Sequence, residues 1–201
     1  MLFPRCRPHV NPLAITKEVS FDGFENNNPL VVDIGSYKGE FVKALADKHP
    51  EKNYIACEIR TPIANALRTM FKDYQNVVVF DGDAGLNFQK LLEPSLEKGI
   101  KLERVYVNFP DPWFKESHKK RRFINHNFLK SIHSWFPSEA EIVFQTDQEF
   151  LFEETQEYLI DSGFEVIEVF HNPPFGVQTN WEKAKSECGK TIFRCIIKKK
   201  K

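Results

Sequence analysis

The chain has 201 residues, 41% of them hydrophobic and 28% charged, with 28 basic and 28 acidic residues, so its formal net charge is zero. This length fits one folded domain with a short extension, and the hydrophobic fraction argues against a disordered chain. The four cysteines have no C-x-x-C spacing, which argues against a disulfide framework or a zinc cluster. No apolar run approaches the ~18 residues of a membrane span, and residues 1–7 lack the apolar stretch of a signal peptide. These features favour a soluble cytoplasmic protein.

The zero net charge hides a segregated distribution. Residues 115–122 carry a net charge of +4 and residues 198–201 another +4, so the remaining chain carries −8. A basic surface that binds nucleic acid is therefore compatible with this composition. The terminal lysines are interpreted as a basic, solvated tail.

Short β-rich runs alternate with helical patterns along most of the chain. Residues 1–29, which contain four prolines, are predicted to form an irregular N-terminal arm, and the organised domain is predicted over residues 30–197. Strands are predicted at 30–34, 54–59, 77–80, 104–109, 141–146, 164–170 and 191–197, and helices at 40–48, 62–73, 86–92, 123–135 and 148–161. This alternation predicts an α/β fold with a doubly wound, mostly parallel sheet. No helix is evident between the last two strands, which favours an antiparallel final pair.

Five successive predicted strands end at or near a carboxylate. In sheets of this class ligands bind beyond the carboxyl ends of the strands, so we expect these residues to converge: Asp33, Glu58, Asp83, Asp111 and Asp147. Like charges crowded together call for a cation. A metal held by oxygen ligands remains open, but a positively charged organic cofactor is the more economical interpretation. S-adenosylmethionine carries a sulfonium, an ammonium and a ribose but no phosphate, and it suits this edge better than NAD or ATP.

The turn after the first strand contains Gly35 and Gly39, which would allow a ligand to approach the backbone closely. The dinucleotide fingerprint needs further glycines where Tyr37 and Glu40 stand, which argues against an NAD-dependent oxidoreductase. Glu58 follows Gly39 by 19 residues, close to the spacing of an acid that binds a cofactor ribose. A plain tight turn and a surface glutamate are the alternatives.

The segment from Asn108 to Trp113 combines two prolines, an aspartate and an aromatic residue. The prolines predict a rigid turn, which could hold a substrate base, although a buried tryptophan beside a bend has the same pattern. The basic run that follows directly favours contacts with phosphates over a merely solvated face.

This segment carries a family resemblance. Asn-Phe-Pro-Asp-Pro-Trp-Phe-Lys at 108–115, His-Lys-Lys-Arg-Arg at 118–122, Thr-Asp at 146–147 and Thr-Asn-Trp-Glu at 179–182 resemble motifs of the bacterial-type tRNA (guanine-N7)-methyltransferases, and the similarity runs from about residue 31 to residue 197. The resemblance implies a seven-stranded class I methyltransferase fold with an antiparallel final strand pair. It also implies cofactor contacts at Asp33, Glu58, Asp83 and Asp111, and substrate contacts at Lys115, Asp147, Thr179, Asn180, Trp181 and Glu182. The implied substrate is a guanine in the variable loop of tRNA.

The implied reaction needs little acid–base chemistry. Guanine N7 has an in-plane lone pair and no proton, so it attacks the methyl group directly and catalysis depends mainly on positioning. We expect Asp111 to stabilise the positive charge that develops on the guanine. We expect the basic loop to bind the tRNA backbone through Ser117, His118, Lys119, Lys120, Arg121 and Arg122.

Other functions stay open at this point. A tyrosine at position 37, where the family's cofactor loop has its middle glycine, motivates an RNA-binding protein of the same fold without catalysis. A methyltransferase for another nucleic acid or a small molecule has the same local features. No metal site and no obligate protein partner is indicated, and both a monomer and a homodimer remain open.

Overall fold

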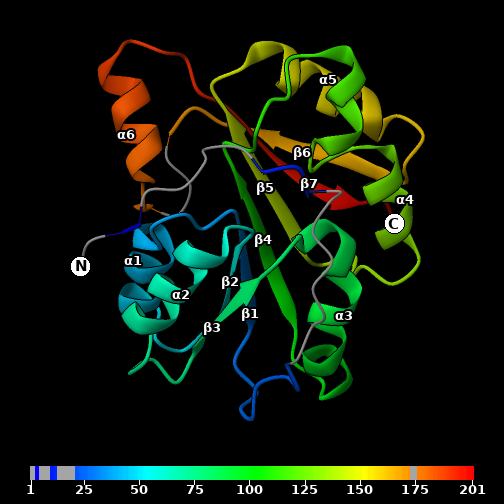
Figure 1. The fold of residues 1–201 in the computed structure, drawn as a ribbon. Helices are drawn as coiled ribbons and strands as arrows, with labels where there is room; N and C mark the ends of the chain where they lie inside the picture. The colour runs from blue at the N-terminus through cyan, green and yellow to red at the C-terminus, as the bar shows by residue number, and fades with distance from the viewer. Residues whose placement is uncertain (1–2, 5–9, 13–20, 173–175) are drawn as a thin grey trace. The chain divides into compact units, whose positions relative to one another are not determined.

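A computed structural model of the chain describes residues 3–4, 10–12, 21–172 and 176–201 (Figure 1). The chain forms two compact units, residues 1–103 and residues 104–201, which are taken separately below. The N-terminal arm predicted over residues 1–29 lies partly outside the described residues. Among the described residues, no helix has the length and apolar character needed to cross a membrane.

The first unit holds three parallel strands and three helices. They are β1 (Leu30–Ile34), α1 (Glu40–Lys48), β2 (Asn53–Glu58), α2 (Thr61–Met70), β3 (Val77–Asp81) and α3 (Ala84–Glu97). β2 pairs in parallel with β1 on one side and with β3 on the other. All six residues of β2 are buried, as expected for a central strand covered on both faces.

Local sequence signals explain where these helices begin and how they pack. α2 has a proline in its first turn, where a missing N–H costs nothing. Before α1, Gly39 has a φ of +71°, and a Cβ there would lie 2.6 Å from the Leu67 side chain of α2. The glycine is therefore required for close packing of α1 against α2.

The second unit begins within β4 (Leu102–Asn108). It continues with the 3-10 helix η2 (Glu116–Arg121), α4 (His126–His133), β5 (Glu141–Thr146), α5 (Glu149–Leu159), β6 (Phe164–Val169), α6 (Asn180–Glu187) and β7 (Phe193–Lys199). β4 and β5 are parallel, whereas β7 is antiparallel to both β5 and β6. The carboxyl ends of β4 and β5 therefore lie at the same edge of the sheet.

The seven strands have the order β3-β2-β1-β4-β5-β7-β6, which confirms the predicted mostly parallel α/β sheet with an antiparallel final pair. β7 comes last in the chain but stands between β5 and β6. Its final registered residue, Lys199, is paired with Phe164, so the strand continues two residues past its predicted end.

Several predicted boundaries differ from the structure, most of all those of α3, and two helices were missed. α3 extends through Pro94 to residue 97, well beyond the predicted end at residue 92, because Leu91, Leu92 and Ser95 are buried and packing overrides the proline. α6 was missed because it buries only Glu182, so it has no apolar periodicity. η2 buries no side chain and was missed for the same reason.

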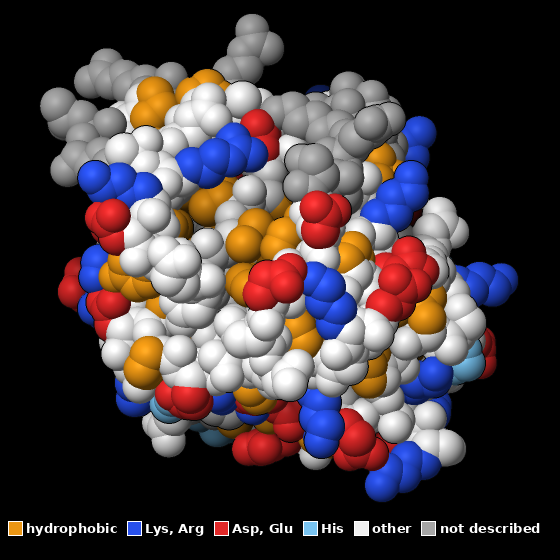
Figure 2. Space-filling view, turned by 90° about the horizontal axis from the view of Figure 1, so that it is seen from below, with side chains coloured by type: hydrophobic (Ala, Val, Ile, Leu, Met, Phe, Trp, Pro, Cys, Tyr) orange, Lys and Arg blue, Asp and Glu red, His pale blue; other side chains and the backbone are white. Residues whose placement is uncertain are grey.

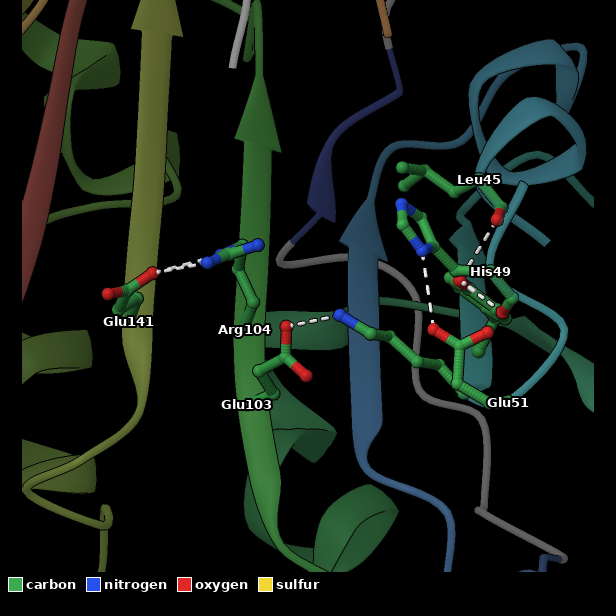
Figure 3. Close-up of polar contacts among 8 residues, drawn as sticks. Leu45, His49, Glu51, Glu103, Arg104 and Glu141 are labelled. Carbon is green, nitrogen blue, oxygen red and sulfur yellow. Dashed lines mark hydrogen bonds and ion pairs between the residues drawn. The ribbon is translucent and has the colours of Figure 1, made fainter. Parts of the chain in front are cut away.

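Ion pairs lie near the amino ends of strands in each unit (Figure 3). Lys52 lies 2.6 Å from Glu103 in the first unit, and Arg104 lies 2.7 Å from Glu141 across β4 and β5 in the second. The face seen in Figure 2 shows acidic, basic and apolar side chains interspersed, so neither sign of charge dominates it.

Candidate active site

Three predicted cofactor residues of the first unit lie at or beyond the carboxyl ends of adjacent strands, and their charges act on the buried Cys57. Burial, followed by the negative charges of Asp33, Asp83 and Glu58, raises the pKa of Cys57 well above its usual value. Asp33 is the penultimate residue of β1, Glu58 ends β2, and Asp83 follows β3. The structure therefore brings together Asp33, Glu58 and Asp83, as the pattern of strand ends predicts for this half of the sheet.

The turn after β1 leaves its backbone open at Gly35. This residue has a φ of +80°, and a Cβ placed on it would have no heavy atom within 4 Å. The N–H groups of Gly35 and Ser36 donate to the carbonyl of Cys57 at 2.9 and 2.8 Å, which fixes the turn against β2. Open space beside a fixed backbone is the geometry that close approach of a ligand needs.

Glu58 is only 1% exposed, and its carboxylate accepts four hydrogen bonds. Arg60 donates through its backbone N–H at 2.8 Å to Oε1 and through its guanidinium at 2.7 Å to each oxygen. The N–H of Tyr37 donates to Oε2 at 3.1 Å. A ribose can bind this carboxylate only if the Arg60 side chain moves away.

Arg60 also lies with its guanidinium carbon 5.0 Å from the ring centroid of Tyr37. Tyr37 has a φ of +47°, a left-handed conformation that costs a non-glycine residue roughly 1–2 kcal/mol. Arg60 was not among the predicted site residues. The available signal was that Arg60 follows Glu58, the carboxylate predicted to bind a ribose, by two residues.

Asp83 caps α3, since its Oδ1 accepts from the N–H of Leu86 at 2.8 Å. Burial raises the pKa of Asp83 above its ordinary value, although hydrogen bonds from the backbone of Leu86 and Gly85 lower it. An ionised carboxylate at this position is therefore costly to the folded protein until a cation or a donor satisfies it.

We expect Asp83→Asn to raise thermal stability at neutral pH, because asparagine keeps the cap without burying a charge. The folded protein binds the Asp83 proton more tightly than the unfolded chain does, so wild-type stability falls as pH rises through and above the usual Asp value of 3.8. Thermal unfolding of both proteins from about pH 3 to about pH 8 should show the difference opening over that interval. A difference independent of pH would contradict this assignment.

In the second unit, the Asn108–Trp113 turn is strained and anchored. Phe109 and Trp113 have φ values of +48° and +46°, and left-handed residues of this kind persist only where surrounding contacts hold them. Arg122 supplies such contacts, donating to the carbonyls of Pro112 at 2.8 Å and Trp113 at 3.1 Å. Asp111 lies half-buried within this turn, between its two prolines.

Arg122 is itself buried, and its guanidinium is paired with Glu154 of α5. Lys119 lies 3.1 Å from the same carboxylate and 2.8 Å from Glu116. Two cations of the basic run are thus engaged by carboxylates of this unit. The signal that sequence reasoning missed is Glu154, the one acidic residue among the buried residues of α5.

The remaining residues of the basic run are more accessible. Lys115, Ser117 and Lys120 are exposed, and Arg121 lies with its guanidinium carbon 5.0 Å from the ring centroid of Trp113. His118 is half-buried with its ring 5.6 Å from Trp113. Burial, helped by the charges of Arg121 and Lys115, lowers the pKa of His118.

The predicted substrate residues after β5 and on α6 lie together. Lys185 of α6 lies 2.8 Å from Asp147 at the end of β5, and its Nζ is 4.8 Å from the ring centroid of Trp181. Burial raises the pKa of Asp147, but hydrogen bonds from Lys185 and Gln148 outweigh it, so the carboxyl titrates below its usual value. Thr179 caps α6 by accepting from the N–H of Glu182 at 2.9 Å, and Asn180 and Trp181 are exposed.

Glu182 is fully buried and is bound by a residue that sequence reasoning missed. Arg194 of β7 donates to its Oε1 at 2.7 Å and to Oε1 of Gln145 at 3.2 Å. Gln145 in turn donates to Asn108 at the start of the turn, at 2.8 Å. Within the described chain, Oε2 of Glu182 has no hydrogen-bond partner. A continuous polar network therefore links α6 to the Asn108–Trp113 turn.

Each unit thus assembles its own part of the predicted site. The first holds the predicted cofactor residues other than Asp111, and the second holds the Asp111 turn, the basic run and the α6 residues. Among the described residues, no group of three or more His, Cys, Asp or Glu side chains is arranged to hold a metal ion. Convergence of all five carboxylates stays a prediction.

Solved structures define the class of fold. A structure described as an antibiotic-related methyltransferase superposes with a TM-score of 0.58 and 18% identity, covering 84% of this chain and 87% of the other. A family model described as "Putative methyltransferase" matches residues 27–195. The fold is a methyltransferase fold.

Curated relatives narrow the class. The tRNA (guanine-N(7)-)-methyltransferase of Synechococcus elongatus is 35% identical over 151 residues, which are 71% of this chain and 70% of the relative. The protein of the same name from an Exiguobacterium species is 33% identical over 178 residues, 85% of this chain and 80% of the relative. The chain belongs to the tRNA (guanine-N(7)-)-methyltransferase family.

Proposed function

We propose that this protein transfers a methyl group from S-adenosylmethionine to N7 of a guanine in the variable loop of tRNA. The observation that carries the proposal is that Asp33, Glu58 and Asp83 stand at or beyond the carboxyl ends of three adjacent parallel strands, beside an open glycine turn, in a chain of this family. The substrate and the modified atom follow from the names of its relatives. We infer that the protein meets its tRNA substrate in the cytoplasm.

The first unit's residues suit the cofactor chemically. The cofactor supplies a methyl group made electrophilic by a positively charged sulfur. Asp33, Glu58 and Asp83 offer negative charge and hydrogen-bond acceptors to its cationic and hydroxyl groups, and Gly35 leaves room beside the backbone. The guanidinium of Arg60 must release the Glu58 carboxylate before a ribose hydroxyl can bind it.

In the second unit, Asp111 is assigned to the reaction itself. The attacking nitrogen needs no general base, so the protein's contribution is to orient the guanine and to stabilise the positive charge that develops on it. A carboxylate held between two prolines changes little during the reaction, and that preorganisation makes electrostatic stabilisation effective. We assign Asp147 and the α6 residues Asn180 and Trp181 to contacts with the guanine and its neighbouring nucleotides.

The basic run is assigned to the tRNA backbone. Lys115 and Lys120 are exposed, so their charges are available to phosphates. Arg122 is buried and holds the turn, and its direct contact with RNA stays a prediction. N7 faces the deep, narrow major groove in A-form RNA, so the target guanine must lie in a loop or a distorted region.

The test is incubation of the purified protein with methyl-labelled cofactor and unmodified tRNA, followed by nucleoside analysis. We expect label in 7-methylguanosine, in tRNA whose variable loop carries a guanine. Label in another nucleoside, or transfer to a small molecule and not to tRNA, would contradict the proposal. A tRNA in which that guanine is replaced by adenine is the matched control.

One observation favours a second candidate, an RNA-binding protein without catalysis. Arg60 and Tyr37 together occupy the Glu58 carboxylate. Calorimetry with the cofactor separates the two: cofactor binding supports the enzyme, whereas no binding at millimolar concentration supports the alternative.

A further inference from the structure

Two aromatic side chains form an exposed apolar surface on the second unit. Phe114, directly after the Asn108–Trp113 turn, is 71% exposed, and Phe150, in the first turn of α5, is 37% exposed. Their ring centroids are 5.6 Å apart and the rings are tilted by 45°. Most large apolar side chains of this fold are buried, so an exposed aromatic pair from two separate segments calls for an explanation.

The surroundings of this pair are cationic and aromatic. The exposed Lys115 follows Phe114 directly, and the guanidinium carbon of Arg122, which is buried and paired with Glu154, is 5.3 Å from the ring centroid of Phe150. Arg121 and Trp113 form a second cation–aromatic pair in the same loop. Exposed Glu149 adjoins Phe150, whereas Glu116 is paired with Lys119. Aromatic rings interleaved with cations fit unpaired nucleotides, whose bases stack on the rings while their phosphates meet the cations.

We propose that Phe114 and Phe150 form a stacking platform for an unpaired base of the RNA substrate, next to the guanine that is modified. This inference rests on the proposed function and adds a contact to it. Phe114 stands three residues after Asp111, so a base on the platform belongs to a nucleotide that flanks the target. Stacking does not discriminate strongly among bases, so the platform adds affinity without reading sequence.

The experiment measures the affinity of unmodified tRNA for Phe114→Ala and Phe150→Ala by filter binding across a range of salt concentrations. Each change should weaken binding about 5- to 150-fold, the range found when one stacked base loses its aromatic partner. The slope of log affinity against log salt should stay that of the wild type, because no phosphate contact is lost. Lys120→Ala should instead reduce that slope by about 0.7–0.9.

Ile160→Ala is the matched control, because Ile160 is 69% exposed and lies at the other end of α5. It should bind tRNA like the wild type. Phe114→Trp keeps a stacking ring, so it should retain wild-type affinity. Circular dichroism should show that all variants are folded.

Phe114→Ala and Phe150→Ala proteins that bind and methylate tRNA like the wild type would overturn the platform and leave the proposed function intact. A change in sedimentation with unchanged RNA binding would also overturn it, and would assign the pair to a protein contact. A wild-type protein that neither binds nor methylates tRNA would overturn both.

Discussion

Asp111→Ala should lower the rate of methyl transfer to unmodified tRNA by about 100- to 1,000-fold, the usual cost of removing one preorganised group that stabilises charge in the transition state. The expectation follows from the placement of Asp111 between two prolines, in a turn whose left-handed residues Phe109 and Trp113 are held by Arg122. A carboxylate fixed in this way stabilises the developing charge on guanine without having to reorganise.

Single-turnover kinetics with saturating tRNA and cofactor measure this effect apart from binding. Asp111→Asn keeps the shape of the side chain and removes its charge, so it should lose most of the rate as well. The exposed Asp161, changed to Ala, is the matched control and should be without effect. Unchanged turnover by a folded Asp111→Ala protein would remove this residue from the reaction.

Arg194→Met should destabilise the protein by about 3–5 kcal/mol, because it leaves Glu182 buried without its cation. Glu182 is 0% exposed and Arg194 is 5% exposed, and their ion pair is 2.7 Å long. Arg194 also donates to the carbonyl of His171 at 2.6 Å, so the methionine leaves that backbone group without this donor. Urea unfolding followed by circular dichroism measures the loss.

Arg104→Met is the matched control in the same unit. Arg104 pairs with Glu141 across β4 and β5, at side-chain exposures of 14% and 19% (Figure 3). Lys198 lies 3.3 Å from the same carboxylate and remains as a partner, so the expected loss is about 1 kcal/mol. Adding Glu182→Gln to Arg194→Met should recover part of the stability, because no buried charge is then left unpaired. Equal losses from Arg194→Met and Arg104→Met would refute the assignment.

The strands and most helices were predictable because local patterns and tertiary packing agree. β1 and β5 have their predicted limits, since the short apolar run in each suits a strand buried on both faces. α1 also has its predicted limits, with Phe41 and Leu45 at helical spacing. α6 was not predictable from periodicity, because the contacts that hold it are polar: the Thr179 cap, Lys185 with Asp147, and Glu182 with Arg194.

Sequence alone determined the kind of residue at each strand end, because parallel α/β sheets present the residues after their strands at one edge and the family motifs mark the same positions. Only the tertiary structure decided which of these side chains are already engaged. Glu58 is bound by Arg60 and Tyr37, Arg122 is buried in the turn, and Glu182 is paired with Arg194. Hydrogen bonds between charged groups depend on distances and burial that the fold sets. The spacing of residues along the chain does not predict these distances.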